Sequence, residues 1–171
     1  MKLSYLLMGS VEIIFAISFA VVTLMVGFKA LSIFTGEYDD EKEIKENNIS
    51  VGIISGVFLL CIGLILKTAS GPALSTLENT IFTKDFTVTG LFIGLGLMIL
   101  QLGIASVVAI LSLIFTIFLT TKVSPFKNLK ALMNNNIAIS CIISAVMLVT
   151  VLMINTPLLL LLKGLIPQNK F

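Results

Sequence analysis

Polar stretches divide the chain into four long apolar runs. The runs cover about residues 3–34, 49–66, 86–121 and 137–154. Roughly 18 or more predominantly apolar residues are enough to cross a bilayer as a helix, and runs of this length exceed what the core of a soluble domain needs. The pattern therefore predicts an all-α membrane protein with four transmembrane helices.

The first run has to be distinguished from a secretory signal, because Lys2 precedes it. A signal peptide has an apolar segment of about 7–15 residues that ends at small residues suited to cleavage. The run at 3–34 is longer and lacks such a site. We expect it to be a helix of the mature protein, tilted or projecting because it exceeds the ~20 residues that span a bilayer.

A polar stretch that passes directly into an apolar run occurs twice, 88 residues apart. Between Lys42 and Leu64, the identical pairs at this spacing are Lys42 and Lys130, Asn47 and Asn135, Asn48 and Asn136, Ile49 and Ile137, Ile54 and Ile142, Leu60 and Leu148, and Leu64 and Leu152. Each copy contains two crossings, so both copies enter the bilayer from the same side. We expect two tandem helix-loop-helix repeats in the same orientation, related by an axis along the membrane normal.

A polar residue inside the first and third runs extends this repeat. Glu12 is followed by alanines at positions 16 and 20, and Gln101 by alanines at positions 105 and 109. Positions i, i+4 and i+8 share one helix face. Because a polar side chain that faces lipid is costly, we expect both to point into the bundle. Two roles stay open for Glu12: structural hydrogen bonding, with Gln101 as its partner, and a proton or ion pathway.

Asparagines stand where two of the helices leave water. Asn47 and Asn48 precede the second run, and Asn135 and Asn136 precede the fourth. Asparagine is a favoured N-cap, because its side-chain oxygen accepts from an amide of the first turn, and this accounts for one asparagine in each copy. The functional alternative is a group of amides at the positive helix N-termini that binds an anion or a lipid headgroup.

Proline and glycine set the expected segment boundaries. Gly71-Pro72 and the nearby serines and threonines predict that the second helix ends near Lys67. Pro157 predicts that the fourth helix bends or ends near residue 154. The expected organisation is a first two-helix repeat at 1–67, a connecting loop at 68–85, a second two-helix repeat at 86–154 and a tail at 155–171. The tail is either an interfacial segment or a kinked continuation of the helix.

Composition supports the membrane assignment and excludes several classes of function. Hydrophobic residues make up 57% of the chain and charged residues 12%, with a mean hydropathy of +1.12, whereas about a quarter of a soluble domain is charged. The net charge of +2 is too small to indicate nucleic-acid binding. Histidine is absent, which removes histidine-based catalysis and metal ligation. With no hydrolase or nucleotide-binding motif present, we expect no enzymatic activity, cofactor or metal site.

Three local features add expectations about sites and contacts. The acidic stretch at 35–47 is expected to be a solvated loop, because it lacks the ligand order of a calcium-binding EF-hand. Cys61 and Cys141 lie inside apolar runs, where two buried free thiols are expected in preference to a disulfide. Gly90 and Gly94 have the spacing that lets membrane helices approach closely, so this face is a candidate for homo-oligomer contacts.

The doubled loop and the asparagine spacing resemble the YjfL-like family of bacterial inner-membrane proteins, a four-helix domain of unknown function. The resemblance covers about residues 3–154. The residues that carry it are Glu43, Ile44, Asn48 and Ser50 in the first copy, Leu132, Asn136 and Ala138 in the second, and Gln101 in the third helix. The chain departs from the family pattern at Lys67, in the tail after Pro157, and in having no acid opposite Glu43 in the second copy.

The resemblance implies a multi-pass protein of the bacterial inner membrane with cytoplasmic asparagine loops. It also implies PspA-type envelope-stress proteins as partners, and hence a role in membrane stress or maintenance. Lysines are nearly balanced between the two sides of the four helices, so the positive-inside rule does not assign the orientation. A small channel or transporter that uses the polar residues of the first and third helices is the alternative.

Overall fold

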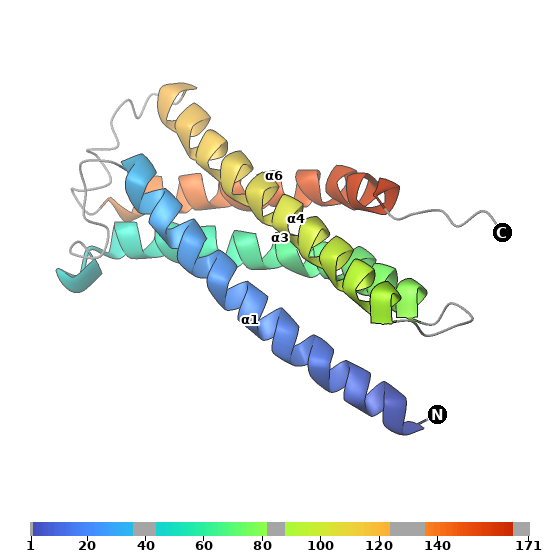
Figure 1. Ribbon diagram of the computed structural model, residues 1–171. Helices are drawn as coiled ribbons and strands as arrows, with labels where there is room; N and C mark the ends of the chain where they lie inside the picture. The colour runs from blue at the N-terminus through green and yellow to red at the C-terminus, as the bar shows by residue number, and fades with distance from the viewer. Residues whose placement is uncertain (1, 36–43, 82–87, 124–135, 166–171) are drawn as a thin grey trace.

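The computed structural model describes residues 2–35, 44–81, 88–123 and 136–165. Within these ranges, nothing is described of the side chains at 2–8, 11, 12, 34, 35, 81, 88, 91 and 123. The described residues form four long helices and contain no strand. The helices are α1 (Lys2–Thr35), α3 (Ile49–Ile81), α4 (Val88–Val123) and α6 (Ile137–Gly164) (Figure 1).

Each helix contains a stretch that is long and apolar enough to cross a membrane. These stretches are Ile13–Ile33, Ile49–Thr80, Phe92–Lys122 and Ile137–Gly164. A helix suits this environment because it satisfies every backbone amide and carbonyl within its own segment, where no water is available. The predicted all-α fold with four potential membrane helices is confirmed.

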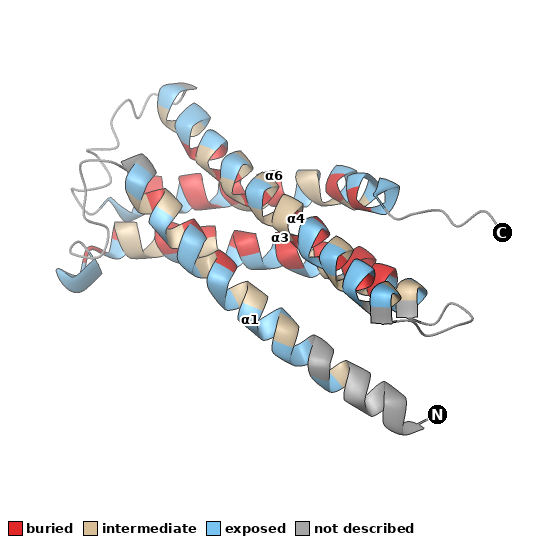
Figure 2. Ribbon diagram, viewed as in Figure 1, coloured by how far each residue is buried: buried red, intermediate tan, exposed pale blue. Residues whose placement is uncertain are grey.

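The chain direction alternates from one helix to the next. In Figure 1, α1 begins and α6 ends on the right, whereas α3 and α6 begin on the left. α3 is the central helix: it packs along both α4 and α6, and α1 lies mainly against α3. Figure 2 shows the buried positions gathered where α3, α4 and α6 meet. The largest of these side chains include Phe58, Ile62, Ile65, Leu113 and Met147.

α1 is the least embedded of the four helices. Only 11% of its most apolar window is buried by the rest of the chain, against 44% for α3. Its first turns diverge from the other helices (Figure 1). Lipid is therefore the main neighbour of α1 in a bilayer, and most of the protein core is built by the other three helices.

One expected helix end is wrong, and one open alternative is decided. α3 does not stop at Lys67 but continues through Pro72 to Ile81, so residues 68–81 belong to the helix and not to a loop. After Pro157 the structure has the continuation of the helix: α6 extends to Gly164, so residues 155–164 are not a separate interfacial segment. A proline removes one amide donor, but ending the helix inside lipid would leave several groups unpaired. Packing also holds these segments, because residues on both sides of each proline lie in the core. They include Ala69, Ala73 and Leu77 in α3 and Val151, Leu158 and Leu162 in α6.

The predicted repeat is only partly visible in the surroundings of the matched residues. Ile54 is 8% exposed, whereas Ile142, its identical counterpart in the sequence, is 45% exposed. Buried residues of α3 correspond to buried residues of α6 at a spacing of 89 residues instead of 88. Examples are Phe58 with Met147 and Ser55 with Ser144. α3 is enclosed on several sides and α6 lies at the edge, so matched positions do not have matched neighbours. The two-repeat organisation stays a prediction.

Two glycines mark close helix contacts inside the monomer. A Cβ atom added to Gly27 in α1 would collide with the Ile62 side chain of α3. A Cβ atom at Gly94 in α4 would collide with Thr80 and would lie 3.2 Å from Leu77, both in α3. The small-residue spacing of α4 thus serves packing within the chain at Gly94.

The two cysteines are both free, but their environments differ. Cys61 is buried against the core, as expected. The expectation for Cys141 is wrong, because its side chain is exposed on α6. The thiol of Cys141 therefore contacts the surroundings of the bundle.

Candidate functional site: a buried amide and an apolar cleft

Gln101 of α4 lies in the interior of the bundle, with 0% of its surface exposed. Its Nε2 donates to the main-chain oxygen of Leu162 in α6 at 3.3 Å. Its Oε1 accepts from the Thr76 hydroxyl of α3 at 3.2 Å. The side-chain amide therefore connects three helices. The structure brings it to the interior face shared with Ala105 and Ala109, both also fully buried.

The Thr76 hydroxyl is shared between two acceptors. It lies 2.9 Å from the main-chain oxygen of Pro72 and 3.2 Å from Gln101 Oε1, and it has one proton to donate. This arrangement lies in the part of α3 that the sequence predicts to be a loop. Sequence reasoning found Gln101 but missed both of its partners, because they depend on α3 and α6 continuing past their prolines.

Glu12 lies on α1, and its side chain is outside the described part of the chain. The alanines that follow it are placed differently from those that follow Gln101. Ala16 is exposed and Ala20 is half-buried, whereas the alanines after Gln101 are enclosed. The Glu12 face of α1 is thus less enclosed than the Gln101 face of α4, and hydrogen bonding between the two side chains stays a prediction.

Asn48 and Asn136 cap the two helices that follow them. Asn48 Oδ1 accepts from the Val51 amide at 3.3 Å, and Asn136 Oδ1 accepts from the Ile139 amide at 3.4 Å. Asn48 is buried and Asn136 is exposed. This geometry is that of N-caps, in which the side chain satisfies an amide of the first turn.

Asn47, the third asparagine of the predicted group, closes the turn before the first of these caps. Asn47 is exposed and has a φ of 62°, in the left-handed region that asparagine tolerates better than most residues. The main-chain amide of Asn47 donates to the main-chain oxygen of Ile44 at 3.1 Å, and this bond closes the turn before α3. Asn135 lies outside the described residues. An amide ring that binds anions stays a prediction.

Hydroxyl groups form further links between helices that sequence reasoning did not single out. Thr23 of α1 lies 3.3 Å from the hydroxyl of Ser106 in α4. Thr116 of α4 donates to Thr150 of α6 at the same distance. The serines and threonines inside the apolar runs could have indicated these links, because such residues commonly form hydrogen bonds between membrane helices.

Two buried polar atoms have no partner within the described residues, Ser144 Oγ and Asn155 Oδ1, both in α6. Buried polar groups usually have a protein or water partner, so these atoms mark places suited to a water molecule or a polar solute. They lie on the same helix but eleven positions apart in the sequence, so they do not form one cluster.

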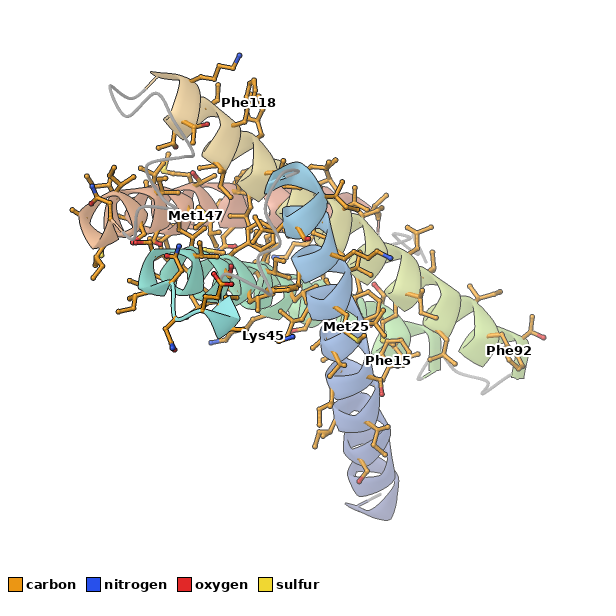
Figure 3. The ribbon with its side chains drawn as sticks, turned by 90° about the vertical axis from the view of Figure 1, so that its left-hand side faces the viewer. Phe15, Met25, Lys45, Phe92, Phe118 and Met147 are labelled. Carbon is orange, nitrogen blue, oxygen red and sulfur yellow. The ribbon has the colours of Figure 1, made fainter. Side chains whose placement is uncertain are left out.

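An apolar cleft of about 260 Å³ lies between α1, α3 and α4. Its walls include Phe15 and Phe19 of α1, Gly63 and Ala73 of α3, and Met98 and Leu102 of α4. The two phenylalanine rings stack with centroids 6.3 Å apart, and Phe15 lies on the side of α1 toward α3 and α4 (Figure 3). Figure 3 also places Phe92 and Phe118 near opposite ends of α4.

Lys67 supplies the charge in the lining of this cleft. The sequence marks Lys67 as the end of a helix, but it lies within α3 and its side chain is exposed. The cleft itself was missed by sequence reasoning. The feature of the sequence that could have indicated the cleft is a set of small residues, because small side chains leave space between helices. These residues are Ala16, Ala20, Gly63 and Ala73.

Most of the chain matches a known protein family. The model of a family described as Domain of Unknown Function (DUF350) matches residues 5–158. No curated protein and no solved structure matches the chain. The narrower likeness to YjfL-like proteins stays a prediction.

Proposed function

We propose that this chain, which belongs to the DUF350 family, is a membrane protein without catalytic activity that serves in membrane maintenance as part of the response to envelope stress. The observation that carries the proposal is the environment of Gln101. Both ends of its buried amide are hydrogen-bonded to neighbouring helices. Such a group strengthens a fixed bundle and is not free to coordinate a moving solute.

The lipid-facing surface supports the same proposal. Large apolar side chains are exposed along every helix, for example Met25, Phe92, Leu111 and Leu152. An exposed apolar surface of this extent fits a protein that acts within and on the bilayer. In a bacterium the proposed location is the inner membrane, with the helix ends capped by Asn48 and Asn136 on the cytoplasmic side. PspA-type stress proteins are the proposed partners at that side.

A small channel or transporter is the second candidate. The unpartnered buried atoms Ser144 Oγ and Asn155 Oδ1 favour it, because both suit a passing water molecule or polar solute. The path would follow α6, and not the first and third helices as the sequence suggests. The two proposals differ in whether the purified protein makes a lipid vesicle leak ions.

The test has two arms. In a bacterial host that carries this protein, its removal is expected to increase the loss of membrane potential after solvent or uncoupler stress, as measured with a potential-sensitive dye. Purified protein in vesicles is expected to leave proton and potassium leakage at the level of empty vesicles. Unchanged stress sensitivity would refute the maintenance role. A leak that Ser144→Ala or Asn155→Leu removes from folded protein would establish the channel instead.

A further inference from the structure

We propose that the cleft between α1, α3 and α4 holds an acyl chain of an anionic phospholipid, whose phosphate pairs with the Lys67 ammonium. The inference rests on the membrane location in the proposed function and not on the stress role. It adds a ligand class and a binding residue to a site that the Gln101 network does not use.

The shape and chemistry of the cleft fit a hydrocarbon chain. The walls come from three helices and are almost entirely apolar, with the stacked Phe15 and Phe19 rings on one side and Met98 on another. The gap exists because Gly63 and Ala73 of α3 leave space beneath α1. A Cβ atom at Gly63 would meet no other atom within 4 Å, so the hollow extends to the α3 backbone.

The cleft is directly accessible to lipid. α1 forms one wall, and most of its apolar surface is uncovered by the rest of the protein. A bilayer lipid can therefore enter sideways without crossing water. Acyl chains are as apolar as the cleft walls, so burial alone does not favour one lipid over another. The preference has to come from the headgroup.

Lys67 provides that preference. It lies within the stretch Ile49–Thr80 of α3, which is long and apolar enough to cross a membrane, and its side chain is exposed. A lysine in such a stretch lays its aliphatic part along apolar surface and extends its ammonium toward the headgroups. No acidic side chain in the described ranges forms an ion pair with it. An uncompensated ammonium near the hydrocarbon is costly, so a lipid phosphate is a suitable counter-ion.

A tryptophan reporter can test the proposal, because the chain contains no tryptophan. In Phe19→Trp the reporter lies in the cleft wall, and in Phe92→Trp it lies on an exposed site of α4. Each full-length variant is placed in phosphatidylcholine vesicles with a small fraction of brominated phosphatidylglycerol or brominated phosphatidylcholine. Bromine quenches a tryptophan that it contacts. We expect phosphatidylglycerol to quench the cleft reporter about fivefold more effectively, the preference typical of one lysine near anionic lipid. At Phe92→Trp the two lipids should quench equally.

Matched variants in the Phe19→Trp background identify the residues responsible for the lipid preference and for lipid entry into the cleft. Lys67→Gln should abolish the preference for phosphatidylglycerol, while Lys163→Gln, which alters an exposed lysine near the end of α6, should leave it intact. Gly63→Phe should fill the cleft and reduce quenching by both lipids. Gly56→Phe, at an equally open site two turns earlier on α3, should not. Helical circular dichroism and elution volume establish that each variant is folded.

Three results would overturn the proposal. Equal quenching of the cleft reporter by the two lipids would show no headgroup preference. A preference retained in Lys67→Gln would remove the assigned binding residue. Absence of quenching by either lipid, with a doubled mass in light scattering, would show that a second copy fills the cleft. These readouts use purified protein, so they are independent of any stress phenotype and distinguish failure of this site from failure of the proposed function.

Discussion

The side-chain amide of Gln101 in α4 donates to the main-chain oxygen of Leu162 in α6, 61 residues further along the chain, at 3.3 Å. Leu162 lies in the last turn of α6, where carbonyl groups lie beyond the regular hydrogen bonds of the helix and need capping partners. The Leu165 amide also donates to the same oxygen at 3.2 Å. Gln101 therefore anchors the end of α6 to the interior of the bundle.

Removal of this anchor should weaken the fold. Gln101→Leu leaves the Thr76 hydroxyl with Pro72 and the Leu162 oxygen with the Leu165 amide, so no partner is left wholly unpaired. We expect a loss of about 1 kcal/mol in the free energy of unfolding, in the range of interhelical hydrogen bonds in membranes. Denaturation in mixed micelles measures it. Thr76→Val and the double variant complete a cycle, and additive effects would contradict a direct Thr76–Gln101 interaction.

Gly94→Ala should destabilise the monomer more than it affects association. The added methyl group collides with Thr80 and presses on Leu77, and overpacking of this kind costs about 1–3 kcal/mol. Gly96→Ala is the control, because a Cβ atom there meets nothing within 4 Å. The measurements are thermal stability and cross-linking in detergent. Equal stability of the two variants, with reduced cross-linking only for Gly94→Ala, would restore the homo-oligomer interpretation of this face.

Asn48 should contribute more to the stability of the fold than Asn47, which precedes it in the turn. Asn48→Ala removes the acceptor for the Val51 amide in a buried site, so we expect a loss of about 1 kcal/mol, typical of an N-cap. Asn47→Gly should be close to neutral, because glycine readily adopts the positive φ found there. Unfolding of the two variants side by side tests this. A larger effect at Asn47 would indicate a role for its exposed amide beyond the turn.

Glu12→Gln distinguishes the two roles predicted for that residue. If Glu12 is structural, the amide should replace a protonated acid with little change in expression or thermal stability. If it handles protons or ions, the variant should stay folded while the stress phenotype or vesicle flux is lost. Glu12→Leu is the companion variant, since only a structural role predicts that removing the polar group lowers stability.

Cysteine labelling in intact cells tests the orientation. Ser124→Cys should resist a membrane-impermeant reagent if the loops that precede α3 and α6 are cytoplasmic. The background has to carry Cys141→Ala, because Cys141 is exposed only five positions into α6, at the same end of the bundle. Cys61 is buried and can be kept. Rapid labelling at position 124 would reverse the assignment.

The four helices could be predicted from the sequence because each apolar run is long enough to cross a bilayer, and a helix satisfies its own backbone groups there. The caps at Asn48 and Asn136 were predictable for a similar reason. They are local, and each involves residues within one turn. The interior position of Gln101 followed from the cost of an amide in lipid.

Tertiary structure alone decided the rest. Ile54 and Ile142 are identical residues in matching sequence contexts, yet one is buried and the other faces outward. In water, polar residues would mark the outer face of each helix. In lipid, both faces are apolar, so the pattern along the chain does not tell inside from outside. For the same reason, three other features depend on which helices pack together: the continuation of α3 past Pro72, the partners of Gln101 and the cleft beside Lys67. That packing involves residues far apart in the sequence.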